Sequence, residues 1–223
     1  MTTEQDKYKY VLSEKESDPL YNEGVADKVM SIFNSDVDRV KVCIDVGAFH
    51  PTWLSNSYDL EQTGWEVHCV EPNPYCISIL KEQRKNVYEY ACSDYNKDDE
   101  ELYIYRQEGI IGDASGTGLI EHSDEYTKSL LAETIKVKVR TLDWLIENEL
   151  HIDHLDFLSI DAEHNEVAVL RGIDFNRWKP KVVVVESLNE LEREQQRSIL
   201  SVFGYKLSTT LVFNDLYIMD IGE

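Results

Sequence analysis

The chain has 223 residues, 42% of them hydrophobic and 10% aromatic, which is the composition of a globular protein with one substantial core. Lys and Arg total 22 against 43 Asp and Glu, and the net charge of −21 disfavours nucleic acid as a partner because such a surface repels phosphate backbones. No apolar run approaches the roughly 20 residues that span a bilayer, and the N-terminus has no signal-peptide core. We therefore expect a cytoplasmic protein that binds neither nucleic acid nor a membrane.

The N-terminal part of the chain, residues 1–40, is predicted to form a polar arm followed by one helix, ahead of a single domain over 41–223. Apolar residues between 23 and 33 recur at helical spacing, which predicts an amphipathic helix there. The four cysteines show no CxxC spacing, and we expect all of them to be reduced packing residues.

The stretch KVCIDVGAFH at 41–50 has the unbroken hydrophobicity of a strand buried on both faces, and Gly47 lets the backbone turn tightly after it. A second apolar strand, 65–70, ends in Glu71. This acid follows Gly47 at roughly the 20-residue spacing at which an acidic residue of a Rossmann-like unit reaches the ribose hydroxyls of a bound cofactor. Together the two features predict a nucleoside-containing cofactor.

The rest of the first half follows the same alternation of helices and strands. The expected elements are a helix over 53–63, the strand over 65–70, a helix over 74–84 and a strand over 87–92. The middle differs, because strands over 101–105 and 135–139 flank the glycine-rich segment GIIGDASGTG at 109–118. A glycine-rich loop of this length in a compact domain is often functional, and we interpret it as a lid within an insert at about 106–134.

The second half restores the alternation and ends in a hairpin. Its expected elements are a helix capped by Thr141, a strand over 157–160 that stops at Asp161, a helix over 163–171, a strand over 182–185 that ends at Glu186, a helix over 188–200, and paired strands over 206–208 and 211–218. A terminal pair of strands after such a run implies a mixed sheet with an antiparallel edge strand.

Several blocks of sequence together resemble the FkbM-type family of S-adenosylmethionine-dependent methyltransferases. The blocks are DVGAFHP with SNSY, GWEVHCVEPNP, ACSD, TLDWL, LDFLSIDAEHNEVAVLRGIDF, PKVVVVE, and GYKL with NDLY, and they span roughly residues 40–218. The resemblance implies an α/β, Rossmann-like class I methyltransferase fold. Such a fold has a seven-stranded, mostly parallel sheet with a C-terminal antiparallel hairpin and helices on both faces.

The resemblance also implies roles for individual residues. Asp45, Gly47 and Ala48 would form the loop under the methionine part of S-adenosylmethionine, and Glu71 would hold the ribose hydroxyls, with Pro72 and Asn73 shaping the turn. Cys92 and Ser93 would lie beside the adenine, and Asp161 and Glu163 next to the reacting centre. One position departs from the family pattern, since His164 stands where relatives usually have a glycine.

Methyl transfer to a hydroxyl needs alignment of the reactants and removal of one proton. His164 is our candidate for the general base, because imidazole titrates near neutral pH and Asp161 lies three positions away. The alternative is that His164 is only an exposed residue on the first turn of its helix. His50 competes for the base role, because it follows the glycine loop and could also line the cofactor pocket.

A divalent metal ion is a further possibility that the sequence does not favour. Asp161, Glu163, His164 and Glu186 could converge on Mg²⁺ at the ends of two strands, but their spacing follows no dedicated metal motif. Glu186 is equally explained as an ordinary acid at a strand end. We therefore assign no metal ligands.

Three hypotheses for the function remain open. The first is an O-methyltransferase that acts on a small-molecule or carbohydrate hydroxyl. The second is a nicotinamide-dependent oxidoreductase, although the loop D-x-G-A-F-H lacks the further glycines that admit a pyrophosphate. The third is a cofactor-binding module without catalysis. The sequence leaves the acceptor and the oligomeric state undetermined.

Overall fold

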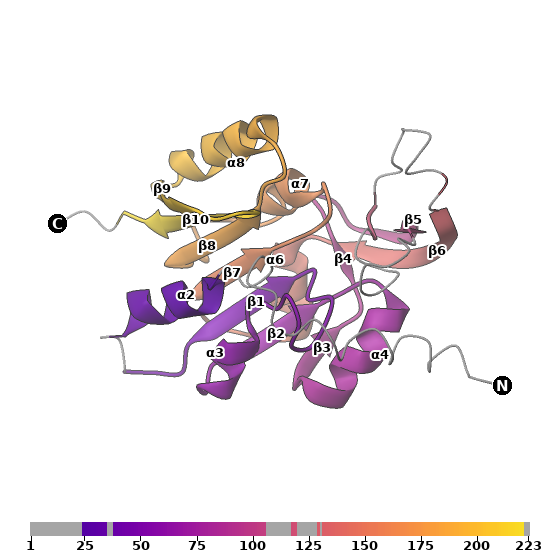
Figure 1. Cartoon of the computed structure of the whole chain (residues 1–223), viewed down its shortest axis with the longest axis horizontal. Coiled ribbons are helices and arrows are strands. Elements are labelled where there is room, and N and C mark those ends of the chain that lie inside the picture. The colour runs from indigo at the N-terminus through magenta and orange to yellow at the C-terminus, as the bar shows by residue number, and fades with distance from the viewer. Residues whose placement is uncertain (1–23, 35–37, 106–116, 120–128, 130, 221–223) are drawn as a thin grey trace.

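The computed structural model describes residues 24–34, 38–105, 117–119, 129 and 131–220. Within these residues, a central sheet of seven strands has the order β3-β2-β1-β7-β8-β10-β9 (Figure 1). Its strands are β1 (Val42–Val46), β2 (Glu66–Val70), β3 (Asn86–Tyr88), β7 (Phe157–Ile160), β8 (Val182–Glu186), β9 (Tyr205–Thr210) and β10 (Asn214–Met219). The first five are parallel, and β10 pairs antiparallel with both β8 and β9. The predicted α/β fold with a C-terminal antiparallel hairpin is confirmed.

Helices cover both faces of this sheet. They are α2 (Val25–Phe33), α3 (Tyr58–Gln62) and α4 (Pro74–Gln83) on one face, and α6 (Leu142–Leu145), the π-helical turn η1 (Ile146–Leu150), α7 (Glu166–Arg171) and α8 (Glu190–Val202) on the other. Successive residues of a strand point to opposite faces, so Val182 and Val184 pack with α2 while Val183 and Val185 pack with α8. This double burial explains why the strands are continuous apolar runs.

The strand predicted over 87–92 is in fact two strands in two sheets. β3 pairs with β2, whereas β4 (Ala91–Cys92) pairs with β6 (Leu131–Arg140) in a second sheet of order β4-β6-β5. β5 (Lys97–Tyr105) and β6 extend to the right of the main sheet in Figure 1. Only Glu89 and Tyr90 separate the two strands, and a single acid in an otherwise apolar stretch is also found within a strand, which is why the sequence pattern did not mark the break.

The helix predicted over 53–63 begins only at Tyr58. The preceding turns hold Leu54 at φ +55°, a left-handed conformation that ends any helix. The helix predicted over 163–171 begins at Glu166, because Glu163 and His164 have φ of +49° and +74°. Both errors lie in loops at the same edge of the sheet. The other predicted elements are present, with ends that differ by a few residues.

The glycine-rich segment predicted as a lid lies mostly outside the described residues. Of its residues, Thr117 and Gly118 are described, and Gly118 forms a bridge with Tyr103 of β5. The lid interpretation and the division at residue 40 stay predictions, and residues 1–23 also lie outside the described part.

The end of α7 meets the smaller sheet at a very close contact between backbones. Gly172 follows α7 and lies against the carbonyl of Ser93, so that a Cβ at position 172 would be 2.3 Å from that oxygen. The N–H of Ser93 donates to the carbonyl of Arg140 at the end of β6. In the described part of the chain, no helix is long and apolar enough to cross a membrane.

Candidate active site

A cavity of about 760 Å³ opens at the carboxyl ends of β1, β2, β7 and β8. From β1 the chain continues to β2 on one side of the sheet, and from β7 it continues to β8 on the other side. The cavity therefore lies at the topological switch point, where open α/β sheets bind ligands. Its volume is within the range of small-molecule pockets. The predicted site residues that line it are Gly47, Glu71, Pro72, Cys92, Asp161 and Glu163.

Gly47 brings the end of β1 into contact with the end of β7. Its φ is +78°, and a Cβ at this position would be 1.6 Å from the carbonyl oxygen of Asp161. The N–H groups of Gly47 and Ala48 both donate to the carbonyl of Val70 at the end of β2, at 2.9 and 3.3 Å. The loop therefore ties three neighbouring strand ends together, and only glycine fits at its first position.

Glu71 is buried at the end of β2 and holds the loop from β1 in place. One carboxylate oxygen accepts from the N–H of Phe49 at 2.9 Å, and the other accepts from the N–H of Asn73 at 2.8 Å. Burial raises its pKa to about 7, although the two backbone donors act in the opposite direction. The carboxylate keeps lone pairs for a further donor, such as the ribose hydroxyls for which the sequence predicted it.

The turn between β7 and α7 is built around a residue that the sequence reasoning missed. Glu166 is 2% exposed, and one of its oxygens accepts from the N–H groups of Ala162 and His164 at 2.9 and 3.1 Å. These bonds hold Glu163 and His164 in their left-handed conformations. A glycine adopts such a conformation easily, whereas a histidine is held in it only by its surroundings. A carboxylate at the first position of a helix is the signal that could have identified Glu166.

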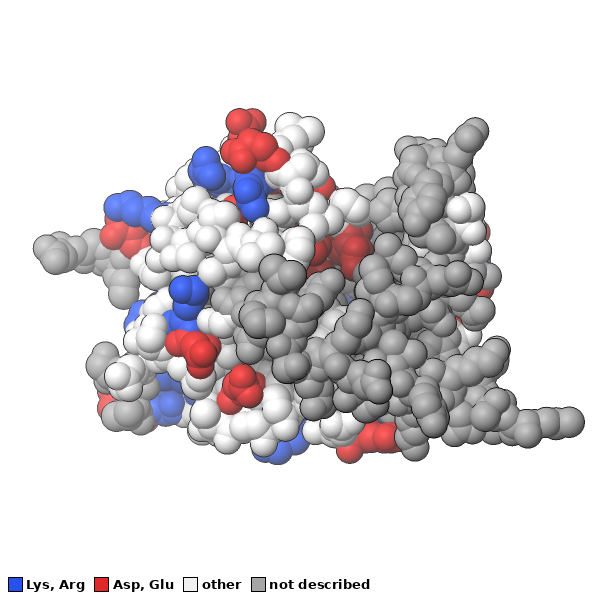
Figure 2. Space-filling view, in the orientation of Figure 1, with Lys and Arg blue, Asp and Glu red and all other residues white. Residues whose placement is uncertain are grey.

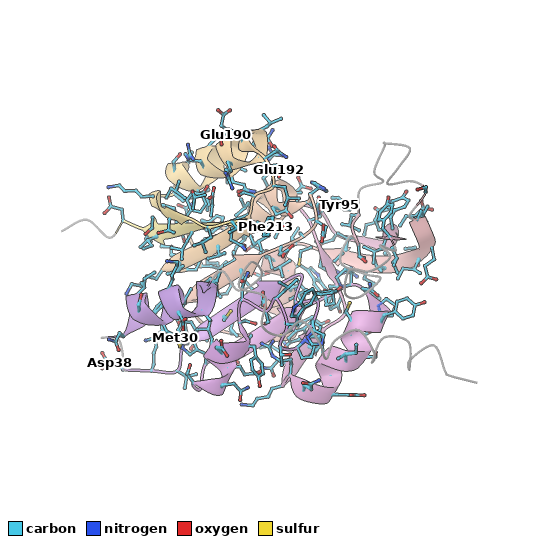
Figure 3. All side chains as sticks on the ribbon, viewed as in Figure 1. Met30, Asp38, Tyr95, Glu190, Glu192 and Phe213 are labelled. Atoms are coloured by element: carbon cyan, nitrogen blue, oxygen red, sulfur yellow. The ribbon has the colours of Figure 1, made fainter. Side chains whose placement is uncertain are left out.

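The ring of His164 contacts α8 rather than the cavity. Its Nδ1 lies 3.2 Å from a carboxylate oxygen of Glu192, on the first turn of α8, whose position Figure 3 shows. Glu163, by contrast, lines the cavity. Burial and the charges of Asp161, Glu166 and Glu71 hold the pKa of Glu163 well above its usual range. The structure therefore brings Asp161 and Glu163 to the site and does not bring the His164 ring there.

Four carboxyl groups converge beneath this turn. Asp161, Glu166 and Glu186 each offer an oxygen within 4.8 Å of the others, and Glu163 adds a fourth charge. Burial, followed by the charges of Asp161, Glu163 and Glu166, raises the pKa of Glu186 to about 11, and that of Glu166 rises to about 7. Figure 2 shows acidic side chains in a hollow near the centre of the molecule, beside residues drawn in grey. A proton or a cation must offset so much buried charge, and the assignment of no metal ligands stays a prediction.

We expect Glu186→Gln to stabilise the protein at high pH. The native Glu186 keeps its proton up to pH of about 11, whereas the unfolded chain releases it near 4.5, so the native state loses stability as pH rises between these values. Gln mimics the protonated carboxyl and cannot ionise in either state. Chemical denaturation with EDTA present should show a gain of up to about 5 kcal/mol at pH 8.5, which lies four units above 4.5, and little change at pH 5. Glu82→Gln on the exposed side of α4 is the control, and a Glu186→Gln protein that is less stable at pH 8.5 would contradict the protonated state.

His50 holds a turn at the edge of the cavity. Its Nδ1 accepts from the N–H groups of Thr52 and Trp53 at 3.2 and 2.9 Å. Burial lowers its pKa to about 4, so the ring is neutral at pH 7 and Nδ1 remains an acceptor. Its side chain does not line the cavity, and roles in cofactor contact or proton transfer stay predictions.

The remaining predicted residues surround the cavity at different depths. Asp45 is buried in β1 and accepts from the Ser57 hydroxyl at 2.5 Å. Asn73 caps α4 by accepting from the N–H of Tyr75, and its amide donates to Thr117 at 3.2 Å. Cys92 lines the cavity, whereas Ala48 and Ser93 are buried behind the lining. All four cysteines are free and buried, as predicted.

The cavity fits the cofactor that the sequence predicted. Gly47 and Glu71 lie at neighbouring strand ends of one cavity, which is the arrangement that the cofactor hypothesis requires. A carboxylate for ribose hydroxyls is present in Glu71. The carboxylates of Asp161 and Glu163 suit the positive charge of a sulfonium compound.

A mostly parallel seven-stranded sheet in this order, with an antiparallel hairpin after β8 and a cavity at the switch point, defines a Rossmann-like class I methyltransferase fold. The model of the methyltransferase FkbM domain matches residues 45–207. The chain belongs to the FkbM methyltransferase family, and membership implies the use of S-adenosylmethionine.

Solved structures with a related arrangement include two proteins of 13% sequence identity and TM-score 0.42. One is precorrin-6y C5,15-methyltransferase from Geobacter metallireducens, with 87% of this chain and 85% of that chain covered. The other is precorrin 8w decarboxylase from Methanobacterium thermoautotrophicum, with 87% and 88% covered. At this TM-score neither likeness carries an argument about function. A search of curated proteins found no match.

Proposed function

We propose that this protein transfers a methyl group from S-adenosylmethionine to a hydroxyl of a small-molecule or carbohydrate acceptor. The observation that carries the proposal is that Glu71 and Glu163 line one cavity at the switch point of a methyltransferase fold. S-adenosylmethionine supplies a methyl group on a positively charged sulfur. The protein's own residues must then hold the ligands and accept the proton of the hydroxyl.

Glu163 is the base that the geometry supports best. It lines the cavity, and its raised pKa makes the ionised carboxylate a stronger base than an ordinary one. The positive charge of a bound sulfonium would favour that ionised form. Asp161 lies beside it and contributes negative charge that favours a cationic ligand. In this proposal the proton of the acceptor hydroxyl moves to the Glu163 carboxylate, and His164 supports the turn from outside.

The acceptor is proposed to bind in the part of the cavity beyond β8. There Glu186 and Asn214 offer polar groups, and Leu188 and Phe213 offer apolar surface. A mixture of this kind suits a neutral polyhydroxylated molecule better than a phosphate backbone. We further propose that the protein is cytoplasmic and binds neither nucleic acid nor a membrane. The net charge of −21 supports the absence of a nucleic-acid partner, and the buried free cysteines support a reducing compartment.

Calorimetry with S-adenosylmethionine, S-adenosylhomocysteine and NAD tests the cofactor. We expect binding of the two adenosyl compounds with a stoichiometry near one and no heat with NAD. Binding of NAD alone would favour the oxidoreductase, and no heat with any of the three would remove the proposal. Methyl transfer from ¹³C-methyl-labelled cofactor into a cell extract then tests the acceptor, since NMR shifts distinguish O-methyl from N-methyl products. Cofactor binding without any labelled product would favour a non-catalytic module.

A further inference from the structure

The segment from Phe49 to Ser57 forms one wall of the cavity and contains no helix or strand. Its residues in the lining are Phe49, Thr52, Trp53, Leu54, Ser55 and Asn56. Phe49 and Leu54 both have left-handed backbone conformations, with φ of +45° and +55°. Such conformations in residues other than glycine persist only when the surrounding structure imposes them.

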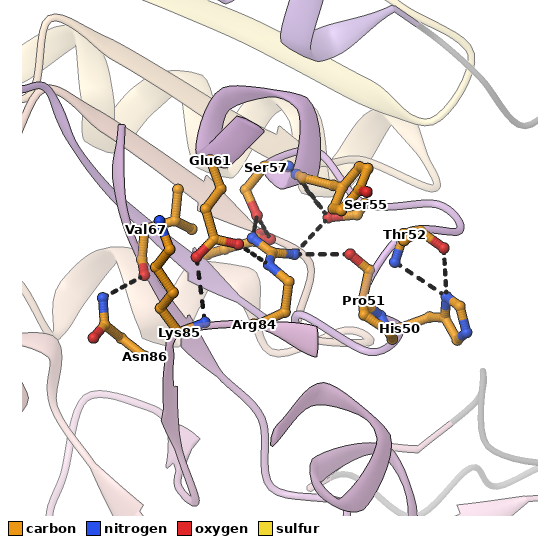
Figure 4. Close-up of polar contacts among 12 residues, drawn as sticks. His50, Pro51, Thr52, Ser55, Ser57, Glu61, Val67, Arg84, Lys85 and Asn86 are labelled. Carbon is orange, nitrogen blue, oxygen red and sulfur yellow. Dashed lines mark hydrogen bonds and ion pairs between the residues drawn. The ribbon is translucent and has the colours of Figure 1, made fainter. Parts of the chain in front are cut away.

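Arg84 lies beneath this wall and contacts it at three residues. Its side chain is fully buried and donates to the carbonyl of Pro51 at 3.0 Å, to the Ser55 hydroxyl at 3.2 Å and to the Ser57 hydroxyl at 2.8 Å (Figure 4). A further bond to Glu61 on α3, at 2.6 Å, balances its charge. Arg84 is the residue that ends α4, so a rigid element on the far side of the wall delivers the guanidinium.

The network beneath the wall continues into the sheet. The Ser57 hydroxyl that accepts from Arg84 donates in turn to Asp45 of β1. The guanidinium of Arg84 therefore lies between two buried carboxylates, Asp45 and Glu61. Arg84 itself is not among the residues that line the cavity. A planar guanidinium can satisfy all these acceptors at once, whereas a lysine ammonium is a single point of charge.

We propose that Arg84 is a positioning residue that fixes the wall formed by Phe49–Ser57 and thereby sets the affinity for the adenosyl cofactor. This inference rests on the proposed function, because it assigns Arg84 a part in binding a ligand that Arg84 does not touch. The wall provides the link: Arg84 holds Pro51, two residues after Phe49, and the N–H of Phe49 donates to Glu71, the carboxylate assigned to the ribose. A wall that loosens moves this donor and releases the carboxylate.

Arg84→Lys is the main test, with S-adenosylhomocysteine as the probe and calorimetry as the measurement. The substitution keeps a charge opposite Glu61 and removes the simultaneous bonds to Pro51, Ser55 and Ser57. We expect at least tenfold weaker binding at a temperature where circular dichroism shows a folded protein. Amide hydrogen exchange should become at least tenfold faster in 49–57 and stay unchanged in α8.

Arg39→Lys is the matched control. Arg39 makes two bonds to Asp156, at 2.7 and 2.6 Å, beside the amino ends of β1 and β7 and so at the edge of the sheet opposite the cavity. The Arg39→Lys substitution should lower the melting temperature and leave the affinity for S-adenosylhomocysteine within twofold of the wild type. This pair separates a positioning role from a general loss of stability, which would raise exchange throughout the chain.

Ser57→Ala keeps the test open if Arg84→Lys does not fold. It removes one hydroxyl that links Arg84 to Asp45 and leaves the ion pair with Glu61 in place, and we expect about threefold weaker binding with faster exchange in 49–57. Wild-type affinity and exchange in every variant that folds would overturn the inference while the proposed function stands. A wild-type protein that does not bind S-adenosylhomocysteine would instead remove the proposed function.

Discussion

Gly47→Ala is expected to lower the stability of the protein by about 4 kcal/mol or more and to abolish cofactor binding. The new methyl group would lie 1.6 Å from the carbonyl oxygen of Asp161, a backbone atom that cannot rotate away. The alanine would also have to adopt the φ of +78° that Gly47 has, which alone costs roughly 1 kcal/mol. The clash is relieved only if the turn after β7 moves outward, and this turn carries Asp161 and Glu163.

The control for this prediction is Gly64→Ala. Gly64 has a φ of +97°, so that it shares the conformational cost, but no atom lies within 4 Å of its added Cβ. We expect it to be destabilised by roughly 1 kcal/mol and to bind S-adenosylhomocysteine normally. Denaturation midpoints and calorimetry on both variants give the comparison. Equal stability of the two alanine variants would show that the contact between β1 and β7 tolerates a side chain.

Glu71→Gln should weaken cofactor binding at least 100-fold at pH 8.5, where Glu71, with its pKa of about 7, carries its charge. Both oxygens of Glu71 accept from backbone N–H groups, those of Phe49 and Asn73. A glutamine has one acceptor oxygen, so its NH₂ group must face one of these donors. One buried N–H is then left unsatisfied, and the charged acceptor for the ribose hydroxyls is lost.

Glu89→Gln is the matched control for Glu71→Gln. Glu89 is exposed and pairs with Lys81 on the surface, an interaction worth about 0–1 kcal/mol. Calorimetry with S-adenosylhomocysteine at pH 8.5 on both variants measures the effect on binding. A Glu71→Gln protein that binds as tightly as the wild type would show that the ribose hydroxyls are held elsewhere.

The strands and most helices followed from hydrophobic pattern because each is buried on a defined face. Val182–Val185 is apolar on both sides and is a strand packed on both sides. Glu71 and Asp161 were also placed correctly at strand ends, since the position of a strand end depends on local sequence. Gly47 was identified for the turn it makes, and the structure adds the contact with Asp161 that no local pattern contains.

The parts that sequence reasoning missed depend on partners distant in the chain. Arg84 is an ordinary basic residue after a helix in the sequence, and its role appears only when the folded chain brings Pro51 and Ser57 to it. His164 was chosen as a base for its chemistry and its nearness to Asp161 in sequence. Its left-handed backbone directs the ring to Glu192 instead, and periodicity carries no information about such a conformation.

The contact of Gly172 with the Ser93 carbonyl limits how this protein can change shape. With 2.3 Å between that oxygen and the position of a Cβ, the two backbones interlock without any side chain between them to act as a flexible spacer. We therefore expect the smaller sheet and α7 to shift together. A hinge that admits ligands has to be sought away from this joint, among segments that join the cavity from other directions.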